Sequence, residues 1–193
     1  YVCSDMWQPY LKVIAKKIPT AMHILDRFHI VAKLNTAVDD VRKAEVKRLK
    51  EGGYENVLTK LKYCFLKRPE NLTSNQELKL NDVLQYNLRS VRAYLLKESF
   101  QLFWAYTSPY WAQWYLRQWC TRTMRSRLDP MKKFVGTIRR HEHLIMNWFK
   151  ARKAYSSGVV EGMNRRVNLI TRKAYGYRSQ KALEVALFHT LGD

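Results

Sequence analysis

The sequence predicts an α/β fold that is mostly helical and that begins with one strand–helix–strand unit. Two short apolar runs, residues 1–4 and 21–25, have the length and composition of buried strands. Between them Leu11, Ile14 and Ile18 recur at helical spacing, and beyond the second run the helical spacing continues almost to the end of the chain. We therefore expect a small α/β start, a long helical region and a final return to the core.

The strand–helix–strand unit predicts where ligands bind. Pro9 suits the first turn of a helix and Pro19 stops it, so a short helix is expected from about Pro9 to Ile18. Such a unit pairs its strands in parallel through a right-handed crossover. Asp5 and Asp26 each follow the carboxyl end of a strand, which is the edge where open α/β sheets bind ligands.

Helices account for the next part of the chain. A long amphipathic helix runs from Ile30 to Leu49 and ends at a pair of glycines. Thr73 with Gln76 resembles a capping box, which marks the start of another helix. Leucines at helical spacing continue this pattern to Leu95.

Three further breaks divide the remainder of the chain, at residues 108–109, 129–130 and 156–158. The first precedes an aromatic-rich helix, and at the second we expect Asp129 to cap a helix whose first turn holds a proline. The third opens a basic helix that ends near Gly176, before a closing helix.

The charge of the chain points to a polyanionic partner. Thirty-five Lys and Arg face sixteen Asp and Glu, a formal net charge of +19. An excess of this size in a folded chain is typical of proteins that contact phosphates. Three separated cysteines, Cys3, Cys64 and Cys120, are expected to be reduced cytosolic thiols. No apolar run reaches the length of a membrane span, and Tyr1 begins inside a strand-like run, so we expect a cytoplasmic fragment of a longer protein.

One carboxylate stands out in the basic helix. Glu161 is surrounded in sequence by Arg and Lys, with Asn164 and Arg165 on the same side of the helix. A lone acid in a basic, asparagine-rich strip suits a site where metal and phosphate meet. The simpler interpretation, which spacing alone favours, is an ion pair between Glu161 and Arg165 one turn later.

The aspartates after the strands also have simpler interpretations. Asp5 could cap the following helix together with Gln8, although Pro9 places the helix boundary at Gln8 and leaves Asp5 in the loop. Asp26 could cap the long helix, with His29 in its first turn, and no chemistry would then be required of either residue.

Four motifs in order resemble one family. They are residues 4–10 (SDMWQPY), 25–29 (LDRFH), 160–164 (VEGMN) and 172–177 (RKAYGY), and a further similar stretch is residues 65–73 (FLKRPENLT). Together they resemble the ISL3 group of bacterial insertion-sequence transposases of the DDE class, over almost the whole chain.

The resemblance implies a partial ribonuclease H-like core with a large α-helical insertion. Residues 1–50 would be the C-terminal part of the core, residues 51–150 the insertion, and residues 151–193 the returning core helices. The family's first aspartate lies on a strand that would precede Tyr1, so we expect this fragment alone to be inactive.

The resemblance also implies a two-metal site for Mg²⁺ or Mn²⁺. By position Asp5 resembles the second catalytic aspartate and Glu161 the third carboxylate, both as metal ligands. Asp26 and His29 resemble a signature that supports the triad, and we assign Asn164 a supporting role as well. The implied reaction is DNA strand cleavage followed by strand transfer.

We expect the partners to be transposon-end and target DNA, and the active complex to be a homo-oligomer without membrane or small-molecule ligands. The predicted DNA surface consists of Arg165, Arg166, Arg172, Lys173 and Arg178. A second interpretation remains open, in which the chain is a non-catalytic basic helical module that binds nucleic acid without cleaving it.

Two remaining patterns favour structural roles. Trp111, Trp114, Tyr115 and Trp119 have the spacing of a buried helix face, which favours a core over a base-stacking platform. The His141-x-His143 pair lacks partners at zinc spacing and is expected to be a solvated turn of a basic helix.

Overall fold

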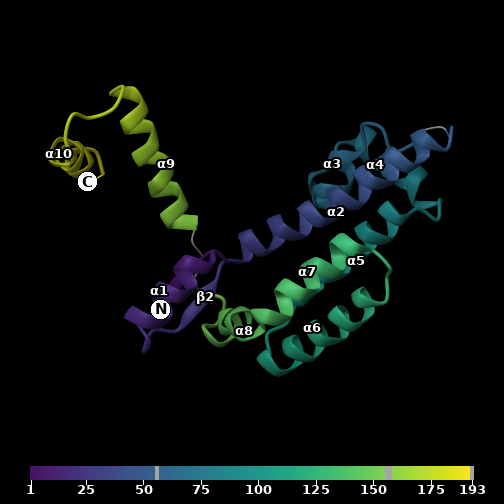
Figure 1. The fold of residues 1–193 in the computed structure, drawn as a ribbon, viewed down its shortest axis with the longest axis horizontal. Coiled ribbons are helices and arrows are strands. Elements are labelled where there is room, and N and C mark those ends of the chain that lie inside the picture. The colour runs from purple at the N-terminus through teal and green to yellow at the C-terminus, as the bar shows by residue number, and fades with distance from the viewer. Residues whose placement is uncertain (55–56, 155–157, 192–193) are drawn as a thin grey trace. The chain divides into compact units, whose positions relative to one another are not determined.

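The computed structural model describes residues 1–54, 57–154 and 158–191, without the side chains of residues 158–161, 163–165 and 190–191. The chain is mostly helical and contains one small parallel sheet (Figure 1). It separates into two compact units, Tyr1–Ala154 and Tyr155–Asp193.

The first unit contains both strands and most of the helices. Its elements are β1 (Val2–Ser4), α1 (Gln8–Lys17), β2 (His23–Leu25), α2 (Arg27–Glu51), α3 (Lys62–Leu66), η1 (Pro69–Asn71), α4 (Ser74–Leu84), α5 (Arg89–Gln101), η2 (Leu102–Ala105), α6 (Pro109–Met124), α7 (Asp129–Arg140) and α8 (Glu142–Lys150). The second unit contains α9 (Gly158–Lys173) and α10 (Gln180–Leu191).

The predicted strand–helix–strand unit is confirmed. β1 and β2 pair in parallel, with Val2 opposite His23 and Ser4 opposite Leu25. α1 begins one residue earlier than expected, at Gln8, and its N-cap is Trp7, which makes no side-chain capping bond.

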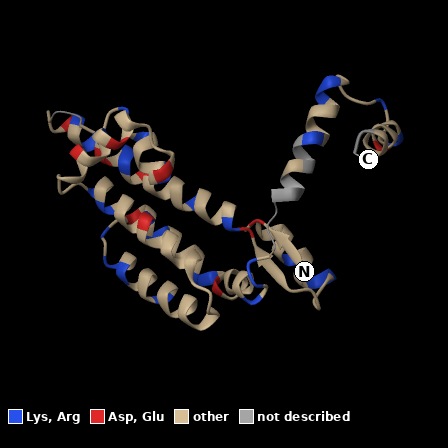
Figure 2. Cartoon of the chain, turned by 180° about the vertical axis from the view of Figure 1, so that it is seen from behind, with Lys and Arg blue, Asp and Glu red and all other residues tan. Residues whose placement is uncertain are grey.

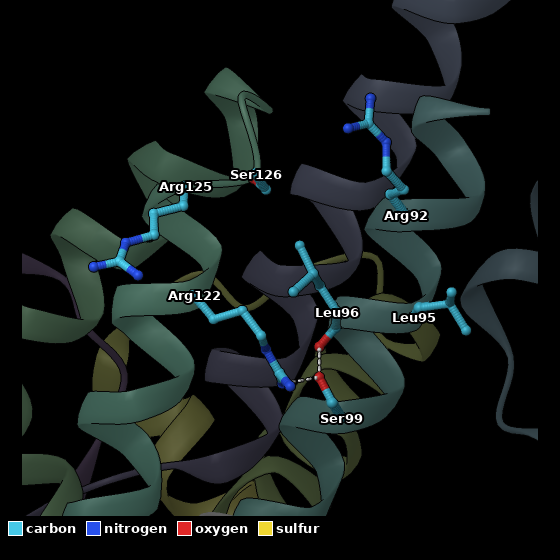
Figure 3. Close-up of a pocket in the computed structure, with 7 residues that line it drawn as sticks. All are labelled: Arg92, Leu95, Leu96, Ser99, Arg122, Arg125 and Ser126. Atoms are coloured by element: carbon cyan, nitrogen blue, oxygen red, sulfur yellow. Dashed lines mark hydrogen bonds between the residues drawn. The ribbon is translucent and has the colours of Figure 1, made fainter. Parts of the chain in front are cut away.

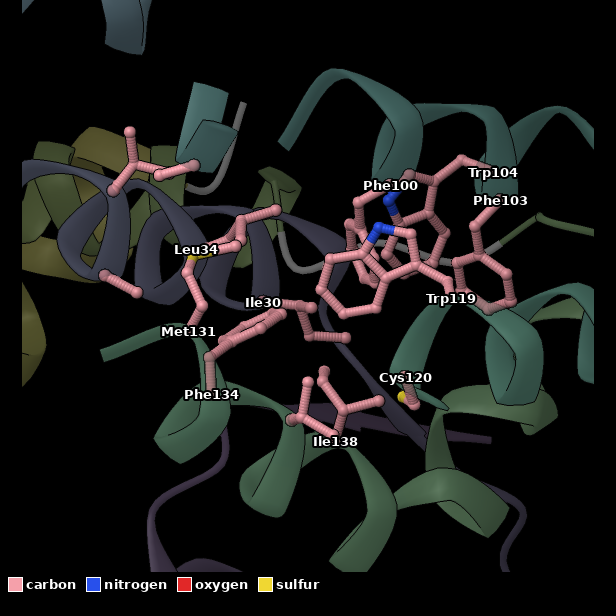
Figure 4. Close-up of a cluster of buried hydrophobic side chains, with 14 of the residues drawn as sticks. Ile30, Leu34, Phe100, Phe103, Trp104, Trp119, Cys120, Met131, Phe134 and Ile138 are labelled. Carbon is pink, nitrogen blue, oxygen red and sulfur yellow. The ribbon is translucent and has the colours of Figure 1, made fainter. Parts of the chain in front are cut away.

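The core of the first unit lies around α2. This helix packs against α5 and α7, α6 packs against α7, and α8 packs against β2. Figure 4 shows the buried side chains where these helices meet. Phe100 of α5 lies at their centre, with its ring centroid 4.7 Å from that of Trp119 and 5.6 Å from that of Phe134. Aromatic edge-to-face contacts therefore contribute to the packing of α5 against α6 and α7.

A buried carboxylate fixes the start of α5. Glu45 of α2 is 2% exposed and accepts hydrogen bonds from the backbone N–H groups of Arg89 and Ser90, at 2.9 and 2.7 Å, and from the Ser90 hydroxyl at 2.6 Å. These N–H groups belong to the first turn of a helix and have no partner within it. The prediction of a helical pattern continuous to Leu95 is thus wrong, because α4 ends at Leu84 and α5 begins anew at Arg89.

Two further predicted helix starts are tested by the structure, and one of them needs a correction. The predicted break at residues 156–158 falls partly on residues 155–157, which lie outside the described residues. Thr73 and Gln76 form the expected reciprocal capping box at the start of α4. α7 begins at Asp129, but its N-cap is Leu128, so Asp129 is not the cap. Asp129 lies in the first turn and pairs instead with Lys132 at 3.1 Å.

The three cysteines carry free thiols, as expected. Among the described residues, no helix combines the length and apolar character needed to cross a membrane.

Candidate active site

The carboxyl ends of β1 and β2 bring two aspartates to one edge of the sheet. Asp5 and Asp26 each follow the last paired residue of a strand, and the strands are parallel. The Asp26 N–H donates to the Ser4 carbonyl at 2.9 Å, which continues the ladder beyond the strand. The predicted position of both aspartates at this edge is therefore confirmed.

Asp5 lies in the loop between β1 and α1. Its Oδ1 accepts a hydrogen bond from the Trp7 N–H at 2.9 Å, the local turn that aspartate commonly makes with the backbone two residues later. The Ser4 hydroxyl donates to the Asp5 carbonyl at 2.8 Å. Because the N-cap of α1 is Trp7, the interpretation of Asp5 as a helix cap is wrong. Asp5 is therefore a half-buried loop residue whose side chain and carbonyl both accept local hydrogen bonds.

Asp26 has the capping role that the sequence allowed. It is 3% exposed, and its Oδ1 accepts from the Phe28 N–H at 3.0 Å as the N-cap of α2. His29 Nε2 lies 4.0 Å from Asp26 Oδ2. Burial, with the neighbouring charge of Asp26 as a smaller cause, raises the pKa of the Cys3 thiol to about 11. A supporting role of Asp26 and His29 in catalysis stays a prediction.

Sequence reasoning missed a polar network beneath this edge. His23 of β2 is buried, its Nε2 lies 2.7 Å from the Ser4 hydroxyl, and its carbonyl accepts from Asn147 Nδ2 of α8 at 2.8 Å. Burial, followed by the charge of His143, lowers the pKa of His23. The only signal in the sequence was a histidine inside an apolar run. The network ties both strands to α8 and so positions the Asp5 loop.

The expectation of a solvated His141-x-His143 turn is wrong for the first histidine. His141 is 5% exposed at the junction of α7 and α8. Its Nδ1 lies 2.9 Å from the Thr137 carbonyl and its Nε2 lies 3.4 Å from Gln8 Nε2 at the start of α1. His141 therefore helps to hold α1 beside the helical region, whereas His143 is exposed.

The second unit carries the remaining predicted residues. Glu161, Asn164 and Arg165 belong to α9, but their side chains lie outside the described residues, so their approach to Asp5 stays a prediction. Four predicted DNA-binding side chains are exposed there, Arg166, Arg172, Lys173 and Arg178. Lys and Arg recur along α9 in Figure 2.

The sheet edge contains the type of ligand atom that a hard divalent cation prefers. Mg²⁺ favours carboxylate oxygens, and Asp5 offers a carboxylate that a backbone N–H already orients. Among the described residues no group of three His, Cys, Asp or Glu could hold a metal ion. The Glu161 side chain lies outside the described residues, so its part in a metal site stays a prediction.

Comparison with known proteins supplies the family. The model of the ISL3 group of DDE transposases, described as a transposase, matches residues 1–187. The chain is 28% identical over 182 residues to the transposase for insertion sequence element IS1001 of Bordetella parapertussis, covering 93% of this chain and 44% of that protein. It is 29% identical over 213 residues to the transposase for insertion sequence element IS1557 of Mycobacterium tuberculosis, covering 99% of this chain and 47% of that protein.

The chain spans about half the length of the curated relatives that it matches. No solved structure shows significant similarity to it. The family match extends over nearly every residue and includes both the sheet edge and α9. The chain therefore belongs to the ISL3 family of DDE transposases.

Proposed function

We propose that this chain is part of the catalytic region of an insertion-sequence transposase that cleaves DNA strands and joins them to a target. The observation that carries the proposal is the parallel pair β1–β2, which ends in Asp5 and Asp26 at one edge, in a chain of the ISL3 family. In open α/β sheets this edge is where ligands bind. Both relatives described above are named as transposases for insertion sequence elements.

The proposed architecture is a ribonuclease H-like core that a helical insertion interrupts. Residues 1–50 and 151–193 belong to the core, and residues 51–150 form the insertion. The order of elements supports this division, because β1, α1 and β2 precede a series of helices and the basic helix α9 follows them. The insertion then separates two carboxylates, Asp5 and Glu161, that act in one site.

The proposed ligands of Mg²⁺ or Mn²⁺ are Asp5 and Glu161. Bound at this edge, two such ions would activate the attacking oxygen and stabilise the leaving oxygen of an in-line displacement at phosphorus. The hydrogen bond from the Trp7 N–H restrains the Asp5 carboxylate in its loop, which supports this proposal. Asp26 caps the first turn of α2 beside His29, and we assign both residues, together with Asn164 of α9, a supporting role.

Removal of the metal tests the proposal. We expect the full-length protein to cleave DNA that carries its transposon ends in the presence of Mg²⁺. Excess EDTA should slow cleavage at least about a thousandfold, because the ions supply several kcal/mol of transition-state stabilisation. Added Mg²⁺ or Mn²⁺ should restore the rate, while gel-shift assays should show DNA binding throughout. Cleavage that continues undiminished in EDTA would contradict the proposed chemistry.

The basic face of α9 is the proposed surface for the DNA backbone. Reversing two of its exposed charges, with Arg166→Glu and Arg172→Glu, should weaken binding to any DNA sequence about tenfold at low salt. The slope of log K against log salt should fall by about two, because two phosphate contacts are lost. Fluorescence anisotropy over a salt series measures both quantities.

A matched variant separates this effect from a loss of net charge. Lys50→Glu with Lys79→Glu makes the same charge change at exposed positions of α2 and α4. We expect this control to alter affinity and slope much less. Equal effects of the two double variants would mean that α9 has no specific part in binding.

A further inference from the structure

A basic pocket lies between α5 and the end of α6, in the helical region of the first unit. It has a volume of about 360 Å³ and is lined by Arg92, Leu95, Leu96, Ser99, Arg122, Arg125 and Ser126. Figure 3 shows Arg92 on α5 and Arg122 and Arg125 on the facing end of α6, with the two leucines on the α5 side. Three of the seven lining residues are arginines and none is acidic.

These arginines differ from others in the same unit by their lack of counter-charges. Arg48 pairs with Glu45 at 3.1 Å and Arg117 pairs with Glu142 at 2.8 Å. Within the part of the chain that the structure describes, Arg92, Arg122 and Arg125 form no ion pair. All three positive charges line one pocket, so an anion bound there would be attracted by each of them. Phosphate matches the planar fork of donors that guanidinium presents.

One arginine is already oriented. Arg122 Nη2 donates to the Ser99 hydroxyl at 3.0 Å, and that hydroxyl donates to the Leu96 carbonyl at 2.9 Å. Trp119 Nε1 also donates to the Ser99 oxygen, at 3.1 Å. The Ser99 side of the pocket is thus attached to the aromatic core. Because Arg122 is already ordered, less side-chain entropy is lost when a ligand binds.

The same outward face of α6 carries exposed tryptophans. Trp111 is 54% exposed and Trp114 is 50% exposed, which corrects the expectation that both belong to the core. Only Trp119 of the three α6 tryptophans is buried, because the inward face consists of Ala112, Leu116, Trp119, Cys120 and Thr123.

The tryptophans and the arginines form one stripe along the helix. Residues 111, 114, 118, 122 and 125 follow one another at steps of three and four, so their side chains share one face. Gln118 lies between the two groups, and none of the five is acidic. The stripe is about 21 Å long at 1.5 Å per residue, or about six phosphate spacings of one DNA strand.

We propose that this α6 stripe, together with the basic pocket, binds a DNA strand, with backbone phosphates at Arg92, Arg122 and Arg125 and unpaired bases stacked on Trp111 and Trp114. Aromatic faces beside a row of cations are the means by which proteins hold single strands. An apolar protein partner would not explain why arginines without counter-charges continue the same face. The inference rests on the proposed function, because it assumes that DNA is the ligand of the whole protein.

Two DNA probes and two pairs of substitutions test this surface in the full-length protein. The probes are a blunt duplex and the same duplex with an unpaired tail, and binding is followed by fluorescence anisotropy. Arg92→Glu with Arg125→Glu should weaken the binding of both probes at least about tenfold. The slope of log K against log salt should fall by about two. Trp111→Ala with Trp114→Ala should weaken the binding of the tailed probe alone, again at least about tenfold.

Matched controls accompany each pair. Lys50→Glu with Lys79→Glu repeats the charge change outside the pocket, and Tyr86→Ala removes another exposed aromatic, 54% exposed, from a different segment. Trp111→Phe with Trp114→Phe keeps a stacking surface and should keep most of the affinity for the tail. Thermal melts check the fold, and Arg125→Ala alone serves if the double reversal unfolds.

The outcomes separate this inference from the proposed function. If the arginine and tryptophan variants bind both probes as the unmodified protein does, the proposal that the α6 surface binds DNA is wrong, whatever the cleavage assay shows. Loss of cleavage in Asp5→Asn with normal binding to both probes leaves the α6 surface intact. If the unmodified protein binds the tailed probe through the α6 stripe yet never cleaves DNA, the proposed function fails and the α6 surface stands.

Discussion

Replacing Asp5 with asparagine is expected to reduce DNA cleavage and strand transfer by the full-length protein at least about a thousandfold. Loss of a metal-ligating carboxylate removes transition-state stabilisation of several kcal/mol, and each 1.36 kcal/mol corresponds to a factor of ten in rate. The fold should survive, because asparagine keeps an oxygen that can accept from the Trp7 N–H. Cleavage of labelled transposon-end DNA measures the rate, and a thermal melt checks the fold.

The neighbouring aspartate provides the control at the same sheet edge. Asp26→Asn retains a good N-cap for α2, so stability should hold and the loss of activity should be much smaller than in Asp5→Asn. Equal losses in the two variants would mean that Asp5 has no special role.

A double substitution tests whether Asp5 and Glu161 act in one site. Glu161→Gln should cause a loss similar to that of Asp5→Asn, and the two changes together should cost little more than either one, because residues that act as a unit are not additive. Losses that multiply would show that the two carboxylates serve separate sites, and the proposed mechanism would then be wrong.

Replacing Glu45 with alanine is expected to lower the free energy of unfolding by roughly 3 kcal/mol. The substitution leaves the buried Ser90 N–H and hydroxyl and the Arg89 N–H without their acceptor, and each unsatisfied buried group costs about 1–3 kcal/mol. The first turn of α5 then loses the carboxylate that caps it. Urea denaturation followed by circular dichroism measures the change.

Two variants control this measurement. Glu51→Ala removes an exposed carboxylate of the same helix, paired with Lys47 at 3.7 Å, and should change stability by less than about 1 kcal/mol. Glu45→Gln keeps an acceptor, so its loss of stability should lie between those of Glu45→Ala and Glu51→Ala. A Glu45→Ala protein as stable as the unmodified chain would show that α5 starts at Arg89 for another reason.

The start of α5 also shows why part of the fold could not be predicted. The capping box at Thr73 was visible in the sequence because both of its partners lie within four residues. The acceptor for the Ser90 N–H, by contrast, is Glu45, which lies 45 positions earlier. Only folding brings it to the helix end, so the leucine pattern suggested a continuous helix across residues 85–88.

The aromatic helix illustrates a second limit. Trp111, Trp114 and Trp119 share an apolar spacing, but α6 packs through the narrower face that includes Ala112 and Cys120. Spacing gives the period of a helix face and leaves open which of two adjacent faces turns inward. The neighbours α5, α7 and α8 decide this, and their positions depend on contacts distant in the sequence.

The sheet edge was the most predictable part of the candidate site. Two apolar runs around a short helix were enough to place Asp5 and Asp26 beyond parallel strands. Local pattern could not reveal that His23 and His141 would be buried, because their partners, Ser4, Asn147 and Gln8, come from other elements. The meeting of Asp5 with Glu161 rests on the family pattern and stays a prediction.

Helix α2 links the sheet edge to the helical region within the first unit. It begins at the Asp26 cap, spans 25 residues, or about 37 Å, and packs against α5 and α7. Because α5 packs against α2 and also lines the arginine pocket, the packing of α2 sets the distance between that pocket and the Asp26 end of the helix. DNA that contacted both the pocket and this end of the helix would then have to span a set number of nucleotides between them.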